Sequence, residues 1–266
     1  MSSLRDFEYA GWQTAATHYD AFASLTRLFV EPLLDAAEVH AGTRLLDIAC
    51  GNGVVSARAL ERGAITHGID FAPNMVVAAT RQCPGARILQ ADAEALPFND
   101  AQFEAAVSNF GIHHVEHPAR ALAEAHRVLA PGKHFALTFW ARPQDNPTWR
   151  LIAEAVAAKG RRDVPMPAGN IATTSADDFT RLARDAGFAA HEIDVRALDV
   201  RWRLPAGADL VDIFMTSTVR MATLLRAQSP GALLAIRRHV AQNLEAHAHD
   251  GEISLPTRAL LLSARR

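Results

Sequence analysis

Two aspartates and two glycines near the middle of the first half of the chain carry the first chemical signal. Asp47 ends an apolar run in the stretch RLLDIACGNG, and Gly51 and Gly53 follow it. Glycines let the backbone turn tightly and approach a ligand, and the helix expected after them offers free amides. Asp70 ends a second apolar run, HGID, nineteen residues after Gly51. This arrangement is typical of a nucleotide-binding turn.

The two carboxylates each allow two interpretations. Asp47 beside the turn would repel a pyrophosphate but suits a ligand that carries an ammonium and a sulfonium. It can equally cap the loop by accepting backbone amides. Asp70 can accept both hydroxyls of a ribose, which favours an adenosine-type ligand, or it can cap a helix that begins near Pro73.

Two further strand ends carry polar side chains. In ILQADAEALPF, Asp92 can accept from an adenine amine while the Ala93 amide donates to a ring nitrogen, and residues 96–98 supply an apolar wall. In SNFGIHHV, four residues are expected to face the edge of the sheet, namely Asn109, Phe110, His113 and His114.

The elements that must position these residues alternate regularly. Apolar runs predict strands over 44–49, 66–71, 86–92, 103–110 and 134–141. Helical periods predict helices over 54–63, 74–83 and 118–133, the last closed by Pro131 and Gly132. Such alternation predicts an α/β fold with parallel pairing and helices on both faces of an open sheet. Ligands of such sheets bind at the carboxyl ends of the strands.

The second half of the chain has a different pattern. Residues 142–178 are rich in proline, 175–188 predict a capped helix, and 190–200 resemble a strand. Residues 205–249 predict helices only, and the final 253–266 predict a last strand.

Composition narrows the possible partners. The chain has 27 basic and 29 acidic side chains and a sequence pI of about 6.6, which gives no electrostatic reason to bind nucleic acid. No apolar run approaches membrane-spanning length, and two cysteines are too few for a disulfide framework. We therefore expect a soluble cytoplasmic protein that acts on a small molecule, with the oligomeric state open.

Taken together, the motifs LLDIACGNG, GIDFAPNMV, ADAEALPF, SNFGIHHV and RVLAPGK resemble the class I S-adenosylmethionine-dependent methyltransferases. The subgroup they resemble most is the small-molecule family that includes the ubiquinone and menaquinone C-methyltransferases. The resemblance covers residues 40–141 strongly and the final strand loosely. One departure is Lys133, where the family commonly has a second glycine.

The resemblance implies a Rossmann-like, doubly wound sheet of seven strands whose last strand is antiparallel, with a helical cap. It implies an N-terminal lid over residues 1–40, a cofactor-binding half over 41–141, and a C-terminal half with cap insertions over 142–266. S-adenosylmethionine would be the cofactor and S-adenosylhomocysteine its product. The cofactor residues implied are Asp47, Ala49, Gly51, Gly53, Asp70, Phe71, Met75, Asp92, Ala93, Asn109 and Phe110.

Substrate and catalytic residues are the least determined. The resemblance suggests that an N-terminal helix folds over the cofactor, with Trp12, His18 or Tyr19 lining the acceptor pocket, although these side chains can equally pack the segment onto the core. Phe214, Met215 and Met221 can touch the acceptor or belong to the core. His113 or His114 can act as a base, and we expect only one of them to face the pocket. No metal is expected, despite the spacing of His113, Glu116 and His117.

Three functions remain open at this point. The first is in-line methyl transfer to a small, aromatic or hydrophobic molecule. The second is an NAD-dependent oxidoreductase, which would share the sheet, the glycines and Asp70 but would not explain Asp47. The third is a cofactor-binding protein of the same fold without turnover.

Overall fold

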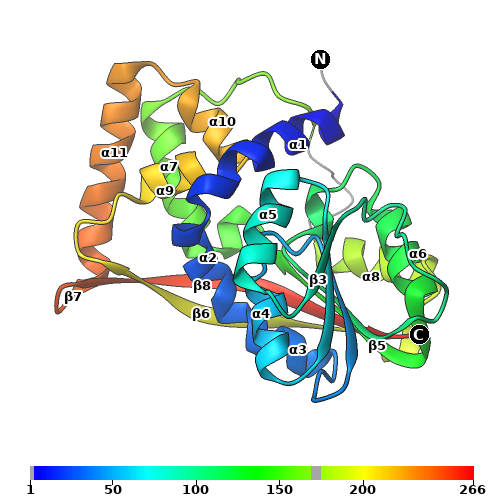
Figure 1. The fold of residues 1–266 in the computed structure, drawn as a ribbon. Coiled ribbons are helices and arrows are strands. Elements are labelled where there is room, and N and C mark those ends of the chain that lie inside the picture. Colours follow the sequence, from blue (N-terminus) through cyan, green and yellow to red (C-terminus); the bar gives the residue numbers. More distant parts are fainter. Residues whose placement is uncertain (1–2, 169–174) are drawn as a thin grey trace.

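The computed structural model describes residues 3–168 and 175–266, and its centre is one mixed sheet with strand order β3-β2-β1-β4-β5-β8-β6 (Figure 1). Five strands are parallel: β1 (Arg44–Ile48), β2 (Ile65–Asp70), β3 (Arg87–Gln90), β4 (Phe103–Asn109) and β5 (Leu129–Trp140). The last strand, β8 (Glu252–Arg265), runs antiparallel between β5 and β6 (Asp194–Pro205). The predicted seven-stranded order with an antiparallel last strand is confirmed, and the two-residue β7 (Ala248–His249) adds an eighth strand beside β8.

Helices cover both faces of the sheet, so it is doubly wound as predicted. On one face lie α3 (Val30–Ala36), α4 (Val54–Glu61) and α5 (Pro73–Gln82). On the other lie α6 (Pro118–Val128) and α8 (Ala176–Asp185), which pack on β5 and β8. The central strands are apolar on both faces because each face is buried under helices.

The remaining helices form a cap beyond the carboxyl ends of the parallel strands (Figure 1). They pack around the long outer parts of β6 and β8 in an apolar cluster that includes Phe22, Trp202 and Phe214. The cap helices are α1 (Leu4–Ala15), α2 (Asp20–Thr26), α7 (Pro147–Lys159), α9 (Leu210–Ser217), α10 (Arg220–Arg226) and α11 (Pro230–Leu244). Within the described residues, the structure contains no helix that combines the length and the apolar character needed to cross a bilayer.

The described chain also contains short 3₁₀ turns. They lie at Ala16–His18, Arg27–Phe29, Ile112–His114, Pro143–Asp145, Ala190–Glu192 and Glu245–His247.

Some predicted boundaries are wrong. The helix predicted over 118–133 ends at Val128, because the chain enters β5 at Leu129. The pairing of β4 with β5 shifts register between Leu129 and His134, and Pro131 and Gly132 lie within this irregularity, where a strand tolerates them. The region predicted as wholly helical from 205 begins only at Leu210, and its end pairs as β7. The proline-rich segment over 142–178, in which we also expect a helical part of the lid from about 143, includes residues 169–174, which lie outside the described part of the chain.

Candidate functional site

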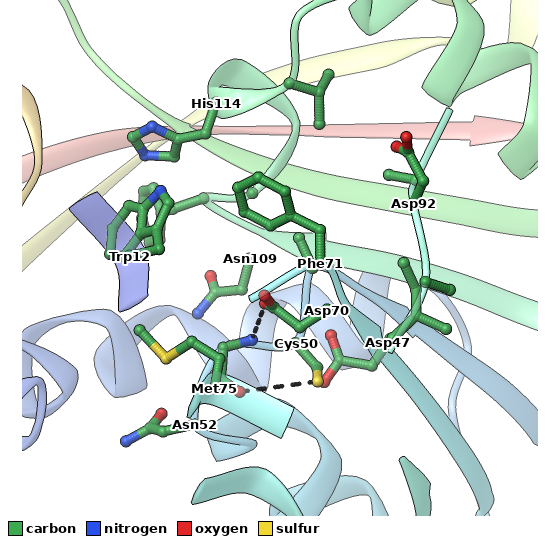
Figure 2. Close-up of a pocket in the computed structure, with 18 of the residues that line it drawn as sticks. Trp12, Asp47, Cys50, Asn52, Asp70, Phe71, Met75, Asp92, Asn109 and His114 are labelled. Carbon is green, nitrogen blue, oxygen red and sulfur yellow. Dashed lines mark hydrogen bonds between the residues drawn. The ribbon is translucent and has the colours of Figure 1, made fainter. Parts of the chain in front are cut away.

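A pocket opens at the carboxyl ends of β1 to β4, beside α1 (Figure 2). This is the edge where an open parallel sheet binds its ligand. The chain alternates strand and helix, so acids placed directly after separate strands meet here although they are far apart in sequence. Most of the predicted site residues line this pocket: Trp12, Tyr19, Asp47, Ala49, Gly51, Asp70, Phe71, Met75, Asp92, Ala93, Asn109, Phe110 and His114.

The turn after β1 is held in place by Asp70. Its Oδ2 accepts a hydrogen bond from the Gly51 amide at 2.9 Å (Figure 2), and its Oδ1 accepts one from the Ala72 amide at 2.9 Å. Ala72 is the N-cap residue of α5, so the capping interpretation of Asp70 is realised in the structure. A carboxylate has about four acceptor positions, so two remain for a ligand.

Gly53 has a different place from Gly51. It caps α4 with φ of 90°, and a Cβ there would come within 2.8 Å of the Cys83 Sγ atom. Gly53 is not among the residues that line the pocket. The structure thus assigns it to turning and helix packing, whereas Gly51 faces the pocket.

Asp47 is fully buried at the end of β1. Its Oδ2 accepts a hydrogen bond from the Ser56 hydroxyl at 2.7 Å, but its Oδ1 has no partner among the described residues. The buried Oδ1 of Asn52, also in the pocket, similarly has no partner within the described chain. Two acceptor atoms without donors fit a ligand that brings a donor such as an ammonium group.

Burial also changes the acidity of both pocket carboxyls. It raises the pKa of Asp47 from 3.8 to about 7. The hydrogen bond from Ser56 acts in the opposite direction and lowers this pKa, whereas the charge of Asp70 raises it further. Burial raises the pKa of Asp70 from 3.8 to about 6, against the effect of the amide hydrogen bonds from Ala72 and Gly51. A cationic ligand would favour the ionised form of both groups.

We therefore expect the affinity for S-adenosylmethionine to increase as pH rises from about 5 to about 8. Well below the pKa of a carboxyl, the affinity should rise by roughly tenfold per pH unit for each proton released. The reason is that the cation binds the ionised carboxylates, so a protonated carboxyl must lose its proton when the ligand binds. Calorimetric titration in buffers of different ionisation enthalpy measures both the affinity and the number of protons released. In Asp47→Asn the dependence should flatten.

The ligand-free chain should respond to pH with the opposite sign. Since the pKa of Asp47 is higher in the folded chain than its ordinary value, the folded state holds a proton that the unfolded state has released between about pH 4 and pH 7. Its thermal stability should therefore decrease as pH rises through that window. Affinity and stability that are both independent of pH would contradict the buried placement of these acids.

At the end of the pocket that is formed by the loop after β3, Asp92 has protein partners on both oxygens. Its Oδ1 accepts from the Glu94 amide at 2.9 Å, and its Oδ2 forms an ion pair with Arg5 of α1. Ala93 is buried beside it. An adenine amine at this place would therefore share the Asp92 carboxylate with Arg5.

The loop after β4 is built tightly against the turn after β1. Phe110 and Ala49 both have left-handed backbones, with φ of 59° and 56°, and both line the pocket. A Cβ at Gly111 would lie 2.6 Å from the Ala49 Cβ, so only glycine fits between the two loops. Residues with strained backbone conformations cluster at functional sites.

Asn109 anchors the loop after β4 through side-chain hydrogen bonds. It donates to the Thr26 carbonyl at 3.1 Å and accepts from the Thr138 hydroxyl at 2.6 Å. Its amide is therefore a structural partner of α2 and β5, although its side chain also lines the pocket.

The two histidines of this loop have different environments. His114 lines the pocket and lies edge-on to the Trp12 indole, with ring centroids 4.9 Å apart. His113 is not a pocket residue; burial, together with the nearby His114, lowers its pKa well below the ordinary value. Only one of the pair faces the pocket, as expected, and it is His114.

Several predicted contacts are absent from the pocket. His18 is exposed, with its Nδ1 atom 2.8 Å from the Thr17 hydroxyl. Phe98 packs on Phe103 and His67 at the edge of the core, and Phe214 is fully buried in the cap cluster. Met215 and Met221 pack against the same cluster. In the described ranges, no group of three metal-ligating side chains, His113, Glu116 and His117 included, could hold a metal ion.

Two residues of α1 contribute to the site without having been predicted. Arg5 pairs with Asp92, and the buried Glu8 contacts both Trp12 and His114. Arg5, Glu8 and Trp12 are spaced by three and four residues, so they share one helix face. That spacing is the signal in the sequence that could have found them.

The comparisons with known proteins agree with this geometry. Residues 46–137 match the family model described as "Methyltransferase domain". This part of the chain is therefore similar to a methyltransferase domain. The matched residues contain most of β1, all of β2 to β4, most of β5, and every strand end that lines the pocket.

Curated relatives are similar to about half of the chain. The demethylmenaquinone methyltransferase of Renibacterium salmoninarum is 34% identical over 129 residues, which is 48% of this chain and 54% of that protein. The malonyl-[acyl-carrier protein] O-methyltransferase of Enterobacter lignolyticus is 31% identical over 148 residues, 54% of this chain and 59% of that protein. The chain thus spans about half the length of the curated relatives it matches.

Solved structures extend the likeness to nearly the whole chain, as a likeness of fold. The phosphoethanolamine N-methyltransferase 2 of Haemonchus contortus has a TM-score of 0.57 at 18% identity and covers 99% of this chain and 60% of its own. The [4+2]-cyclase SpnF has a TM-score of 0.54 at 22% identity and covers 90% of this chain and 81% of its own. A cyclase among the similar folds means that the fold does not define the reaction.

Proposed function

We propose that this protein transfers a methyl group from S-adenosylmethionine to a small aromatic or hydrophobic acceptor. One observation carries the proposal: two buried carboxyls, Asp47 and Asp70, meet in the pocket of a methyltransferase domain, where burial raises the pKa of both. Such a pocket suits a cationic adenosine derivative. It does not suit the pyrophosphate of a dinucleotide, which the carboxylate of Asp47 beside the turn would repel.

Each cofactor residue has a defined task in this proposal. Asp47 and the Gly51 backbone bind the methionine part, Asp70 accepts the ribose hydroxyls, and Asp92 with Ala93 recognises adenine. Phe71 and Met75 supply apolar walls. S-adenosylmethionine, when bound, supplies an electrophilic methyl group on a sulfonium.

The acceptor side of the pocket is aromatic. Trp12, Tyr19 and Phe110 line it, and Phe110 stacks on Trp140 with ring centroids 3.8 Å apart. Flat apolar walls favour a ring system, and relatives such as the 2-phytyl-1,4-naphtoquinone methyltransferase of Nostoc punctiforme are named for quinone-type substrates. The protein's main contribution is to hold the acceptor in line with the methyl carbon and to exclude water.

Binding and turnover test the proposal separately. Calorimetric titration should detect S-adenosylhomocysteine but not NAD, since only the former matches the carboxylates. Isotope-labelled methyl from S-adenosylmethionine should then appear on a reduced 1,4-naphthoquinone that bears a short prenyl chain, or on a simple phenol. Binding of NAD alone would support the oxidoreductase alternative. Binding of S-adenosylhomocysteine without transfer to any acceptor would support a non-catalytic protein of this fold.

The compartment and partners form part of the same proposal. We propose that the protein works in the cytoplasm, where its two cysteines, both free thiols, remain reduced. Its partner is a small-molecule acceptor rather than nucleic acid.

The N-terminal helices act as the lid of this site in our proposal. Removal of residues 1–20 should lower methyl transfer by roughly tenfold or more, because Trp12 and Tyr19 leave the acceptor wall and water enters. Transfer rates and the dissociation constant of S-adenosylhomocysteine should be measured on the same preparation. Thermal unfolding checks that the shortened chain is folded, and normal methylation by a folded chain would contradict the lid assignment.

A further inference from the structure

Glu8 is a buried carboxylate that joins the lid to the pocket. It lies in α1 and is 1% exposed. Its Oε2 atom is 3.1 Å from the Trp12 Nε1 atom, four residues along the same helix, and 3.1 Å from the Nδ1 atom of His114, 106 residues away in the chain. Burial of a carboxylate is costly unless it is hydrogen-bonded, so these contacts fix the position of Glu8.

The contact determines the form of the imidazole. An ionised carboxylate only accepts hydrogen bonds, so the Nδ1 atom of His114 must carry a proton. In a neutral imidazole the Nε2 atom is then left with its lone pair. The Trp12 indole, which can only donate, holds the same Glu8 oxygen and packs edge-on to the His114 ring at 4.9 Å.

We infer that Glu8 is a positioning residue that holds His114 as a base with a bare Nε2 atom. This inference rests on the proposed methyl transfer. With S-adenosylmethionine bound, the acceptor would form a bond to the methyl carbon while the sulfur–methyl bond breaks and leaves its electron pair on sulfur. The acceptor's bond to hydrogen breaks, that electron pair stays on the acceptor, and the proton moves to the Nε2 atom. The carboxylate of Glu8 stabilises the imidazolium that forms. Since Glu8 belongs to α1, the base is complete only when the lid is in place.

The alternative is that Glu8 only pins α1 to the core. In that purely structural role, loss of Glu8 would affect ligand affinity and turnover together, and Glu8 would not determine the tautomer of the imidazole. A positioning residue affects the tautomer and turnover while the affinity for cofactor stays nearly constant.

The test compares Glu8→Ala and Glu8→Gln with Asp6→Asn, which changes an exposed carboxylate on the same helix. Long-range ¹H–¹⁵N correlation spectra report the tautomer of His114, assigned with His114→Ala. The wild type and Asp6→Asn should show one form, protonated at Nδ1, and Glu8→Ala should show a mixture. Glu8→Gln keeps an acceptor, so it should keep more of the Nδ1 form than Glu8→Ala.

Kinetic measurements with an acceptor that is methylated in the isotope-transfer assay complete the experiment. In Glu8→Gln and Glu8→Ala, kcat should fall roughly ten- to a hundredfold or more, with the dissociation constant of S-adenosylhomocysteine changed by less than about threefold. An unchanged tautomer in folded Glu8→Ala, or a loss of turnover matched by an equal loss of affinity, overturns the inference. If the wild type methylates nothing, the proposed function fails, and the spectra still decide whether Glu8 sets the imidazole.

Discussion

His114→Ala should lower kcat by roughly a hundredfold to ten-thousandfold when the acceptor must lose a proton, because it removes the only pocket imidazole in the described structure. The affinity for S-adenosylhomocysteine should change by less than about threefold, since our proposal assigns cofactor binding to the strand ends rather than to this ring. Single-turnover rates with labelled S-adenosylmethionine, measured beside calorimetric affinities, separate the two effects.

Two neighbouring histidines provide the controls. His117 is exposed at the start of α6, so His117→Ala should leave both quantities unchanged. His113→Ala should have a smaller effect than His114→Ala, because His113 does not line the pocket and because desolvation lowers its pKa, which makes it a weaker base. Unchanged turnover in both His113→Ala and His114→Ala would remove histidine from the mechanism and would leave positioning as the whole contribution of the protein.

The strand ends of the site could be predicted from the sequence because local signals mark them. The run before Asp47 is apolar, and the residues directly before Asp70 are buried, since β1 and β2 are interior strands of a sheet covered by helices. A carboxylate directly after such a run must lie at the carboxyl edge of the sheet. Topology then brings these acids together without any knowledge of side-chain packing.

The contacts of α1 could not be predicted in the same way. Arg5 meets Asp92 across 87 residues, and Glu8 meets His114 across 106, so both contacts depend on how the lid docks rather than on local pattern. The role of Gly53 was likewise hidden, because a glycine that packs on Cys83 and a glycine that faces a ligand look the same in sequence. The strand start at Leu129 was missed because Pro131 and Gly132 resemble a helix end but lie in a strand irregularity.

Asp70→Ala should weaken the binding of S-adenosylhomocysteine by roughly ten- to a hundredfold. A charge-assisted hydrogen bond contributes on the order of 1.5–3 kcal/mol, and in our proposal the carboxylate accepts from the ribose hydroxyls. The structure adds a second cause, because the same carboxylate accepts from the Gly51 amide and therefore holds the turn that we propose for the methionine part. Calorimetric titration measures the loss, and Asp6→Asn should bind as the wild type does.

Asp70→Asn distinguishes the two causes. Asparagine keeps one acceptor oxygen but turns an NH₂ group toward either the Gly51 or the Ala72 amide, where a donor meets a donor. We expect an affinity between those of the wild type and Asp70→Ala. The stability of the free chain should change little in Asp70→Ala at neutral pH, because the loss of two hydrogen bonds is offset by relief of the burial that raises the pKa of Asp70 to about 6. Near-wild-type affinity in Asp70→Ala would place the ribose at another strand, since the β2 carboxylate would then have no ligand to hold.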